Sequence, residues 1–166
     1  MLISKEYAEL NRQMHEQPEF GIIGQRYVEI VREMSASYQT KSILDYGCGK
    51  RTMEKALGFD IANYDPAIPG LDKSPMPADI VVCTDVLEHI EFPCLDEVLI
   101  DLRRCTKRAF MAVITVVLAG KTLPDGTNPH RIIAPFDWWL PRLNLLWRMT
   151  YFNDLKKRFI YIGEPR

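Results

Sequence analysis

Two short motifs combine residue types that could bind a ligand. The segment Asp45-Tyr46-Gly47-Cys48-Gly49 ends a short apolar run, and Asp65 ends the next one. Two glycines let a backbone turn sharply and approach a ligand closely. A carboxylate at the end of the following strand can accept hydrogen bonds from ribose hydroxyls. Together the two motifs indicate a site for a cofactor that contains a nucleoside.

Three other interpretations of the Gly-rich segment are open. A phosphate-binding loop is disfavoured, because Arg51 stands where Ser or Thr is needed and Leu44 stands where the first Gly is needed. A dinucleotide fingerprint is disfavoured, because Thr52 occupies the position of its third Gly. The third alternative is a plain structural turn.

The elements that must position these motifs alternate along the chain. Apolar periodicity predicts helices over residues 5–17, 27–37, 52–57, 95–102 and 137–146, and strands over 42–46, 60–64, 79–84, 108–117, 149–152 and 158–162. This order predicts an α/β fold with a Rossmann-like, doubly wound sheet that is mostly parallel. The short connection of the last two strands predicts an antiparallel C-terminal hairpin. Four prolines within residues 66–78 leave no room for a full helix, so the fold is reduced between its second and fourth strands.

Length and charge bound the function. With 166 residues, the chain is predicted to be one domain, with a helical cap over residues 1–38 and a core over residues 40–162. The net charge of −1 hides an asymmetry: residues 1–102 carry 9 Lys and Arg against 18 Asp and Glu, and residues 103–166 carry 12 against 4. The basic second part could attract an anionic partner, nucleic acid included.

Location and metal content are predicted from what the chain lacks. No apolar run reaches the roughly 18 residues that span a bilayer, and the first residues lack the apolar core of a signal peptide. The four cysteines show no zinc-binding spacing. We therefore expect a cytoplasmic protein with reduced thiols, no membrane partner and no metal site.

The motifs resemble those of class I S-adenosylmethionine (SAM) dependent methyltransferases. Leu44–Gly49 is similar to the family's first motif, LDxGCG, and Tyr64-Asp65-Pro66 is similar to the second. Residues 78–90, ADIVVCTDVLEHI, resemble the fourth-strand segment FDxV followed by VLEHV. The combination also resembles small methyltransferase-like proteins of phages and bacteria. The resemblance implies SAM as the cofactor and methyl transfer to an oxygen or nitrogen of a polar acceptor.

The resemblance also implies roles for individual residues. Gly47 and Gly49, in the loop that includes Tyr46 and Cys48, would present backbone to the methionine end of SAM. Asp45 would hold that loop or reach the amino group through water. Asp65 would bind the ribose hydroxyls. The adenine would lie between Pro66 and Ala67, near residues 71–73, and the departing methyl group beside Asp85 and Val86.

Two departures from the family pattern motivate an alternative function. Arg51 replaces a small residue, so it could block the pocket or contact the SAM carboxylate. The Pro-rich segment 66–78 replaces a helix and most of a strand. The alternative is a degenerate SAM-binding protein that acts as a partner subunit or a sensor.

Candidate catalytic residues are two histidines. His89 lies four residues after Asp85, so a helix there would place both on one face. His130 follows the loop after the longest predicted strand. A neutral imidazole could take a proton from a hydroxyl or amine acceptor. His15 is expected on the surface. Trp138 and Arg131 are candidate contacts for the acceptor.

Overall fold

The computed structural model describes residues 1–166 and contains one six-stranded sheet. The spatial order of its strands is β2-β1-β3-β4-β6-β5. Their bounds are β1 Ile43–Tyr46, β2 Ala62–Tyr64, β3 Ala78–Thr84, β4 Thr106–Thr115, β5 Trp147–Asp154 and β6 Arg158–Pro165. The strands β2, β1, β3 and β4 are parallel, and β6 pairs antiparallel with both β4 and β5. The predicted α/β class, the mostly parallel sheet and the antiparallel C-terminal hairpin are confirmed.

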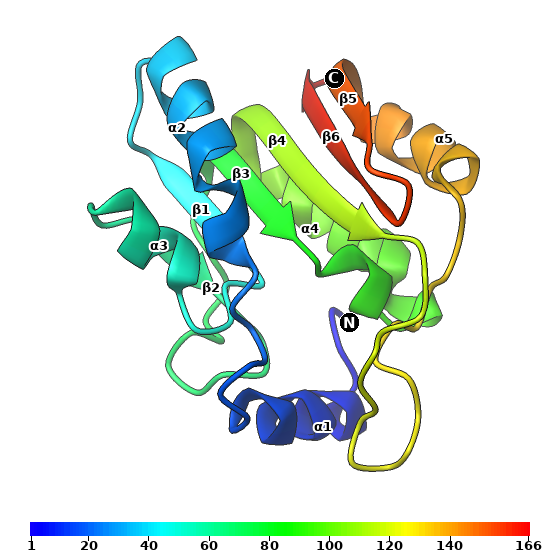
Figure 1. Ribbon diagram of the computed structural model, residues 1–166. Helices are drawn as coiled ribbons and strands as arrows, with labels where there is room; N and C mark the ends of the chain where they lie inside the picture. The colour runs from blue at the N-terminus through cyan, green and yellow to red at the C-terminus, as the bar shows by residue number, and fades with distance from the viewer.

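Helices cover both faces of the sheet (Figure 1). On one face, α2 (Val28–Ser37), α3 (Thr52–Leu57) and the 3₁₀ turn η1 (Gly24–Tyr27) pack on strand residues such as Ile80 and Met111. On the other face, α4 (Leu95–Cys105) and α5 (Phe136–Leu146) pack on residues such as Val81 and Phe110. Neighbouring strand residues point to opposite faces, so one apolar run supplies both cores.

The first helix, α1 (Lys5–His15), does not pack on the sheet. It crosses below the ends of the strands, beside the loop that follows β4 (Figure 1). Its N-cap residue Ser4 binds the Glu91 carboxylate through its backbone N–H at 2.8 Å and its hydroxyl at 2.9 Å. The Tyr7 hydroxyl donates to the Pro129 carbonyl at 2.9 Å. These bonds fix α1 over the carboxyl ends of the parallel strands.

The first helix is shorter than predicted: it ends at His15, before the expected residue 17, and Glu16 caps it. A helix from Asp85 to His89, which would have placed these two residues on one face, is not present, and Asp85 has a left-handed backbone with φ of 53°. A single 3₁₀ turn, η2 (Leu87–His89), follows it. Asp85 and His89 therefore do not share a helix face. No helix of the chain combines the length and apolar character needed to cross a membrane.

Candidate functional site

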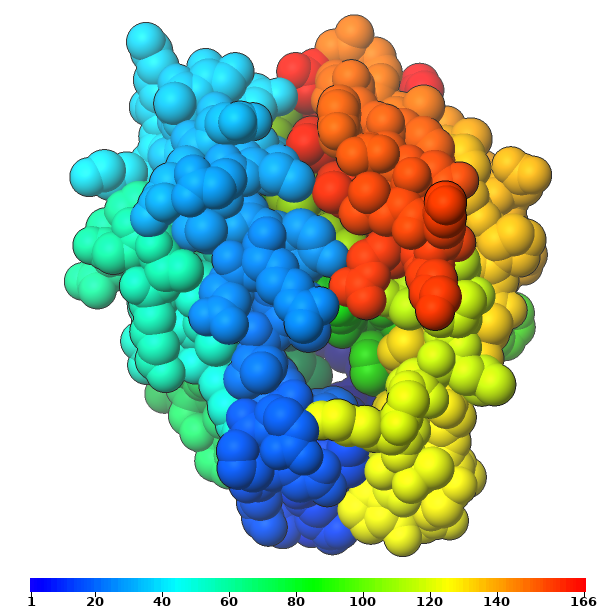
Figure 2. Space-filling view, in the orientation of Figure 1, coloured from blue at the N-terminus to red at the C-terminus, as the bar shows by residue number.

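A cavity of about 600 Å³ opens at the carboxyl ends of β1, β3 and β4. The order of the strands reverses between β1 and β3, and doubly wound sheets bind ligands at such a switch point. The N-terminal segment and the loop after β4 flank the hollow, and Figure 2 shows this yellow loop reaching the blue N-terminal segment across it. Both predicted motifs line the cavity, and so does part of α1, but Tyr46, also expected at the cofactor, does not: its hydroxyl points to Asp101 on α4.

The Gly-rich turn after β1 has the backbone that its sequence requires. Gly47 and Gly49 have φ values of 81° and 50°, in the left-handed region that favours glycine. The backbone N–H of Gly47 and of Cys48 donate to the Tyr64 carbonyl at 2.7 and 3.0 Å. A Cβ atom on Gly49 would lie 2.7 Å from the carbonyl oxygen of Gly21. The turn is thus tied to β2 and packed against the segment that follows α1.

Asp65 connects the two predicted motifs. Its Oδ2 atom accepts a hydrogen bond from the Gly49 N–H at 3.0 Å, and its Oδ1 atom accepts one from the Ala67 N–H at 3.0 Å. Each carboxylate oxygen can accept a second hydrogen bond. The carboxylate therefore shapes the Gly-rich turn and keeps acceptor capacity for a ligand in the cavity.

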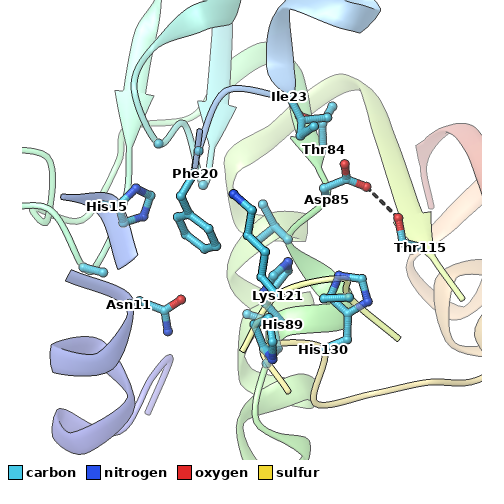
Figure 3. Close-up of a pocket in the computed structure, with 18 of the residues that line it drawn as sticks. Asn11, His15, Phe20, Ile23, Thr84, Asp85, His89, Thr115, Lys121 and His130 are labelled. Carbon is cyan, nitrogen blue, oxygen red and sulfur yellow. Dashed lines mark hydrogen bonds between the residues drawn. The ribbon is translucent and has the colours of Figure 1, made fainter. Parts of the chain in front are cut away.

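The expectation that His15 lies on the surface is wrong. His15 lines the cavity, with its Nε2 atom 3.7 Å from Asp65 Oδ2 and its ring 5.0 Å from the ring of Phe20 (Figure 3). Burial lowers its pKa, and the nearby Asp65 opposes that shift. Its buried Nδ1 atom has no hydrogen-bond partner in the protein. The sequence misplaced His15 because the course of α1 across the cavity is a tertiary feature.

Asp45 lies at the floor of the cavity with only 2% of its surface exposed. Burial raises its pKa to about 7, and the negative charges of Asp65 and Glu54 add to the shift. A neighbouring cation would stabilise the ionised form and lower this pKa again. The position suits a positively charged group of a ligand.

Asp85 follows β3, and its side chain connects this strand to β4 and β6. Its carboxylate accepts a hydrogen bond from the Thr115 hydroxyl at 2.8 Å, drawn in Figure 3, and pairs with Arg158 at 3.3 Å. Arg158 also donates to the Tyr27 hydroxyl at 3.1 Å. Val86 lies directly under the Gly-rich turn. A Cβ atom added to Gly47 would lie only 2.3 Å from the side chain of Val86.

The two candidate catalytic histidines meet at the far side of the cavity. The rings of His89 and His130 are 4.8 Å apart and nearly perpendicular (Figure 3). The Nδ1 atom of His130 lies 2.5 Å from the Val117 carbonyl oxygen. Burial lowers the pKa of His89 to about 3, and His130 adds to the shift. His89 is therefore neutral at physiological pH and is a weak base.

Several expected contacts lie outside the cavity lining. The ring of Trp138 packs on the α4–α5 core and under the guanidinium of Arg142 at 3.6 Å. Arg131 lies over the ring of Tyr7, on the outer side of α1, and donates to the Thr127 hydroxyl. Neither lines the cavity, so the structure does not bring these two acceptor candidates to the site.

The two departures from the family pattern leave the cavity open. Arg51 has φ of 57° and pairs with Glu54 outside the cavity, so it neither blocks it nor offers its guanidinium to a ligand there. Residues 71–73, expected at the adenine edge, also do not line it. Pro66 and Ala67 do.

The cavity residues without a predicted role in binding include five polar ones: Asn11, His15, Thr115, Lys121 and Arg158. They come from α1, from the last residue of β4, from the loop after it and from the first residue of β6. Lys121 donates to the Glu19 carbonyl at 3.1 Å and so joins the β4 loop to the N-terminal segment. One signal could have found Thr115. The ends of adjacent parallel strands lie at the same edge of a sheet, so the end of β4 is expected beside Asp85, which follows β3.

A doubly wound sheet with a Gly-rich turn after its first strand and an acid after its second defines a Rossmann-like protein that binds a nucleoside cofactor. A family model described as a methyltransferase domain matches residues 13–154. The chain belongs to this methyltransferase family. No curated protein sequence matches it significantly.

Solved structures share the fold. An N1-methyltransferase of 1,6-didemethyltoxoflavin from Burkholderia thailandensis, with S-adenosylhomocysteine bound, has a TM-score of 0.66 and 12% identity, covering 96% of this chain and 89% of its own. The DhpI complex with S-adenosylhomocysteine has a TM-score of 0.60 and 17% identity, covering 95% of both chains. Magnesium protoporphyrin IX methyltransferase from Synechocystis, with SAM bound, has a TM-score of 0.57 and 14% identity, covering 90% and 86%. At these identities the likeness concerns the fold.

Proposed function

We propose that the protein transfers a methyl group from SAM to an oxygen or nitrogen of a polar, negatively charged acceptor. The observation that carries the proposal is one continuous cavity, with the Gly-rich turn and Asp65 on one side and His89 and His130 on the other. Family membership and neighbours that were crystallised with SAM or S-adenosylhomocysteine support the cofactor. In this proposal residues 1–38 form the cap over the core of residues 40–162.

The cavity residues fit SAM in size and in chemistry. A volume of about 600 Å³ lies in the range of roughly 300–1,000 Å³ that is usual for small-molecule sites. Asp65 keeps free lone pairs for ribose hydroxyls, and the Nδ1 atom of His15 is buried without a partner beside it. Pro66, Ala67 and Asp45 also line the cavity, and in this proposal the first two flank the adenine and Asp45 neighbours the amino group.

When bound, SAM supplies a methyl group whose carbon–sulfur bond breaks toward sulfur as a lone pair of the acceptor forms the new bond. The chain's own residues then position the two reacting groups and exclude water from them. The Gly-rich turn and Val86 fix the distance between the two reacting groups, and α1 closes the cavity against water. The acceptor's proton needs a receiver, and His130 is the candidate, because the weakly basic His89 serves this purpose poorly.

The charges of the cavity favour an anionic acceptor. The first side of the cavity, formed by the loop after β4 and the start of β6, carries Lys121, Lys157 and Arg158, of which Arg158 is paired with Asp85. The second side, at the ends of β1 and β2, carries the carboxylates of Asp45 and Asp65. A cationic sulfonium is attracted to the second side, and a negatively charged acceptor to the first. The expected acceptor is therefore a hydroxyl or amine compound that also carries a carboxylate or phosphate.

Isothermal titration with SAM tests the proposal. We expect one SAM per chain with a Kd in the micromolar range, and we expect S-adenosylhomocysteine to compete for the same site. A mass spectrum of the protein as purified would reveal carried-over cofactor. A folded protein that gives no heat with either compound would overturn the proposal. Binding of NADH in a fluorescence titration would instead favour a dehydrogenase.

A further inference from the structure

Three side chains at the His130 side of the cavity form a cluster with metal-ligand chemistry. Glu88, His89 and His130 each offer one ligand atom, and these atoms lie within 4.8 Å of one another. The cysteines show no zinc-binding spacing, and no metal site was expected from the sequence. A rule based on sequence spacing misses this cluster, because α4 and β4 separate His130 from Glu88 and His89 along the chain.

The carboxylate of Glu88 is the least expected member of the cluster. The residue is 0% exposed, yet only its Oε1 atom is hydrogen-bonded, to the Thr115 N–H at 2.9 Å. Its Oε2 atom is buried and has no partner in the protein. A buried carboxylate oxygen with no donor needs either a proton or a cation.

The imidazole of His130 is oriented as metal ligands usually are. Its Nδ1 atom faces the Val117 carbonyl oxygen at 2.5 Å. Histidines that bind metals generally donate one ring N–H to such a carbonyl, which directs the lone pair of the other nitrogen toward the ion. His130 thus has one ring nitrogen occupied and one available, and His89 offers one ring nitrogen to the same cluster.

We propose that Glu88, His89 and His130 bind a divalent transition-metal ion at the edge of the cavity. Two imidazoles with one carboxylate suit zinc, iron, cobalt or manganese better than magnesium or calcium. Metal bonds of about 2.1 Å bring ligand atoms to within about 4.2 Å of one another, so small side-chain rotations complete the site. Asp85 is not counted as a ligand, because Thr115 and Arg158 hold its carboxylate.

Three protein ligands leave coordination positions open, and His89 and His130 both line the cavity. An open position there suits an oxygen of the acceptor, because a bound cation lowers the pKa of a coordinated hydroxyl. This part of the inference rests on the proposed methyl transfer and selects a hydroxyl acceptor over an amine. The ion would then activate the acceptor in place of His130, whose lone pair it occupies.

Titration of the chelator-treated full chain with Co²⁺ tests the site, with visible absorption reporting imidazole coordination and Zn²⁺ added in competition. We expect one Co²⁺ per chain, displaced by Zn²⁺. The variants Glu88→Gln and His130→Ala should each lose more than about tenfold in affinity. The matched control is His15→Ala, which removes a histidine from the same cavity but outside the cluster and should bind as the wild type does.

Wild-type protein that binds no Co²⁺, or variants that bind it as tightly as the wild type, would overturn the site. Circular dichroism of each variant establishes that the fold is intact, and Glu88→Gln preserves the shape of a side chain that is buried. A parallel SAM titration separates the two proposals. SAM binding without Co²⁺ binding would overturn only the metal site, and Co²⁺ binding without SAM binding would overturn only the methyl transfer.

Discussion

The cavity has two walls that are built in different ways. The motif wall consists of Asp45, residues 47–49 and residues 65–67, and the loop wall consists of residues 117–121, His130 and Arg158. Backbone hydrogen bonds within and between short consecutive segments hold the motif wall, such as those from Gly47 and Gly49. Side chains from distant parts of the chain hold the loop wall, as Asp85 and Tyr27 hold Arg158. A motif can encode the first kind of wall but not the second.

The two walls also differ in charge. Asp45 and Asp65 lie on the motif wall, whereas Lys121 and Arg158 lie on the loop wall. The sequence contains the same contrast as an acidic first part and a basic second part. The separation suits a reaction that brings a cationic methyl donor to an anionic acceptor. The following predictions test whether the walls divide the work in this way.

The largest effect is expected for Gly49→Ala in the motif wall. A non-Gly residue in the left-handed region costs roughly 1–2 kcal/mol, and the new Cβ would also lie 2.7 Å from the Gly21 carbonyl oxygen. We expect a fall of more than about 2 kcal/mol in the free energy of unfolding, measured by urea denaturation. Gly58→Ala is the control, because Gly58 has φ of 77° but open space around it. An equal loss of unfolding free energy in the two variants would contradict the argument that a Cβ atom at Gly49 clashes with the Gly21 carbonyl.

The second effect separates the walls directly. Asp65→Ala should weaken SAM binding by about 10- to 100-fold in isothermal titration, because the carboxylate that shapes the Gly-rich turn and faces the ribose is lost. The control Asp60→Ala changes an exposed carboxylate and should bind SAM normally. Normal SAM binding by Asp65→Ala would contradict the role of the motif wall.

The third effect belongs to the loop wall. His130→Ala should leave the Kd for SAM within about threefold of the wild type and lower turnover by at least about tenfold. This holds whether His130 takes the proton or holds the ion, and the Co²⁺ titration separates these roles. A loss of SAM binding as large as that of Asp65→Ala would show that the walls do not divide the work.

The fourth effect concerns the pH dependence of stability. The pKa of Asp45 is about 7 in the folded protein and near the usual 3.8 when unfolded. At a pH between these two pKa values, the carboxyl group of Asp45 is ionised in the unfolded chain and protonated in the folded protein. The free energy of unfolding should therefore fall as the pH rises from about 4 to about 7. Asp45→Asn should fall less over this range in denaturation at several pH values. Parallel curves for the two proteins would contradict the assignment.

The smallest effect is expected for Lys121→Ala, which removes the hydrogen bond from the loop wall to the Glu19 carbonyl and the ion pair with the Glu19 carboxylate at 3.8 Å. Exposed pairs contribute about 0–1 kcal/mol, so thermal unfolding should shift by no more than a few degrees. The difference from the wild type should vanish at high salt. A larger loss of stability would mean that the two walls depend on this contact.

Much of the fold follows from local patterns. The strand ending at Tyr46 and the strand over residues 79–84 were predicted within about one residue, because continuous apolar runs mark buried parallel strands. The Gly-rich turn has the positive φ values that its glycines require. The segment after β3 did not follow from such patterns: a helix would have placed Asp85 and His89 on one face, but Asp85 adopts a left-handed backbone while its side chain binds Thr115 and Arg158. Those contacts span 30 and 73 residues of the chain, beyond the range of any periodicity.

The amino-acid sequence by itself determined the sheet, its mostly parallel order and the motif wall, because these depend on hydrophobic period, turn chemistry and neighbours in the chain. Only the tertiary structure decided that His15 faces the cavity and that Trp138 and Arg131 do not. It also decided that Glu88, His89 and His130 meet. The physical reason is that α1 and the loop after β4 have no sheet register to fix them. Their positions come from a few side-chain contacts, such as Ser4 with Glu91 and Tyr7 with Pro129.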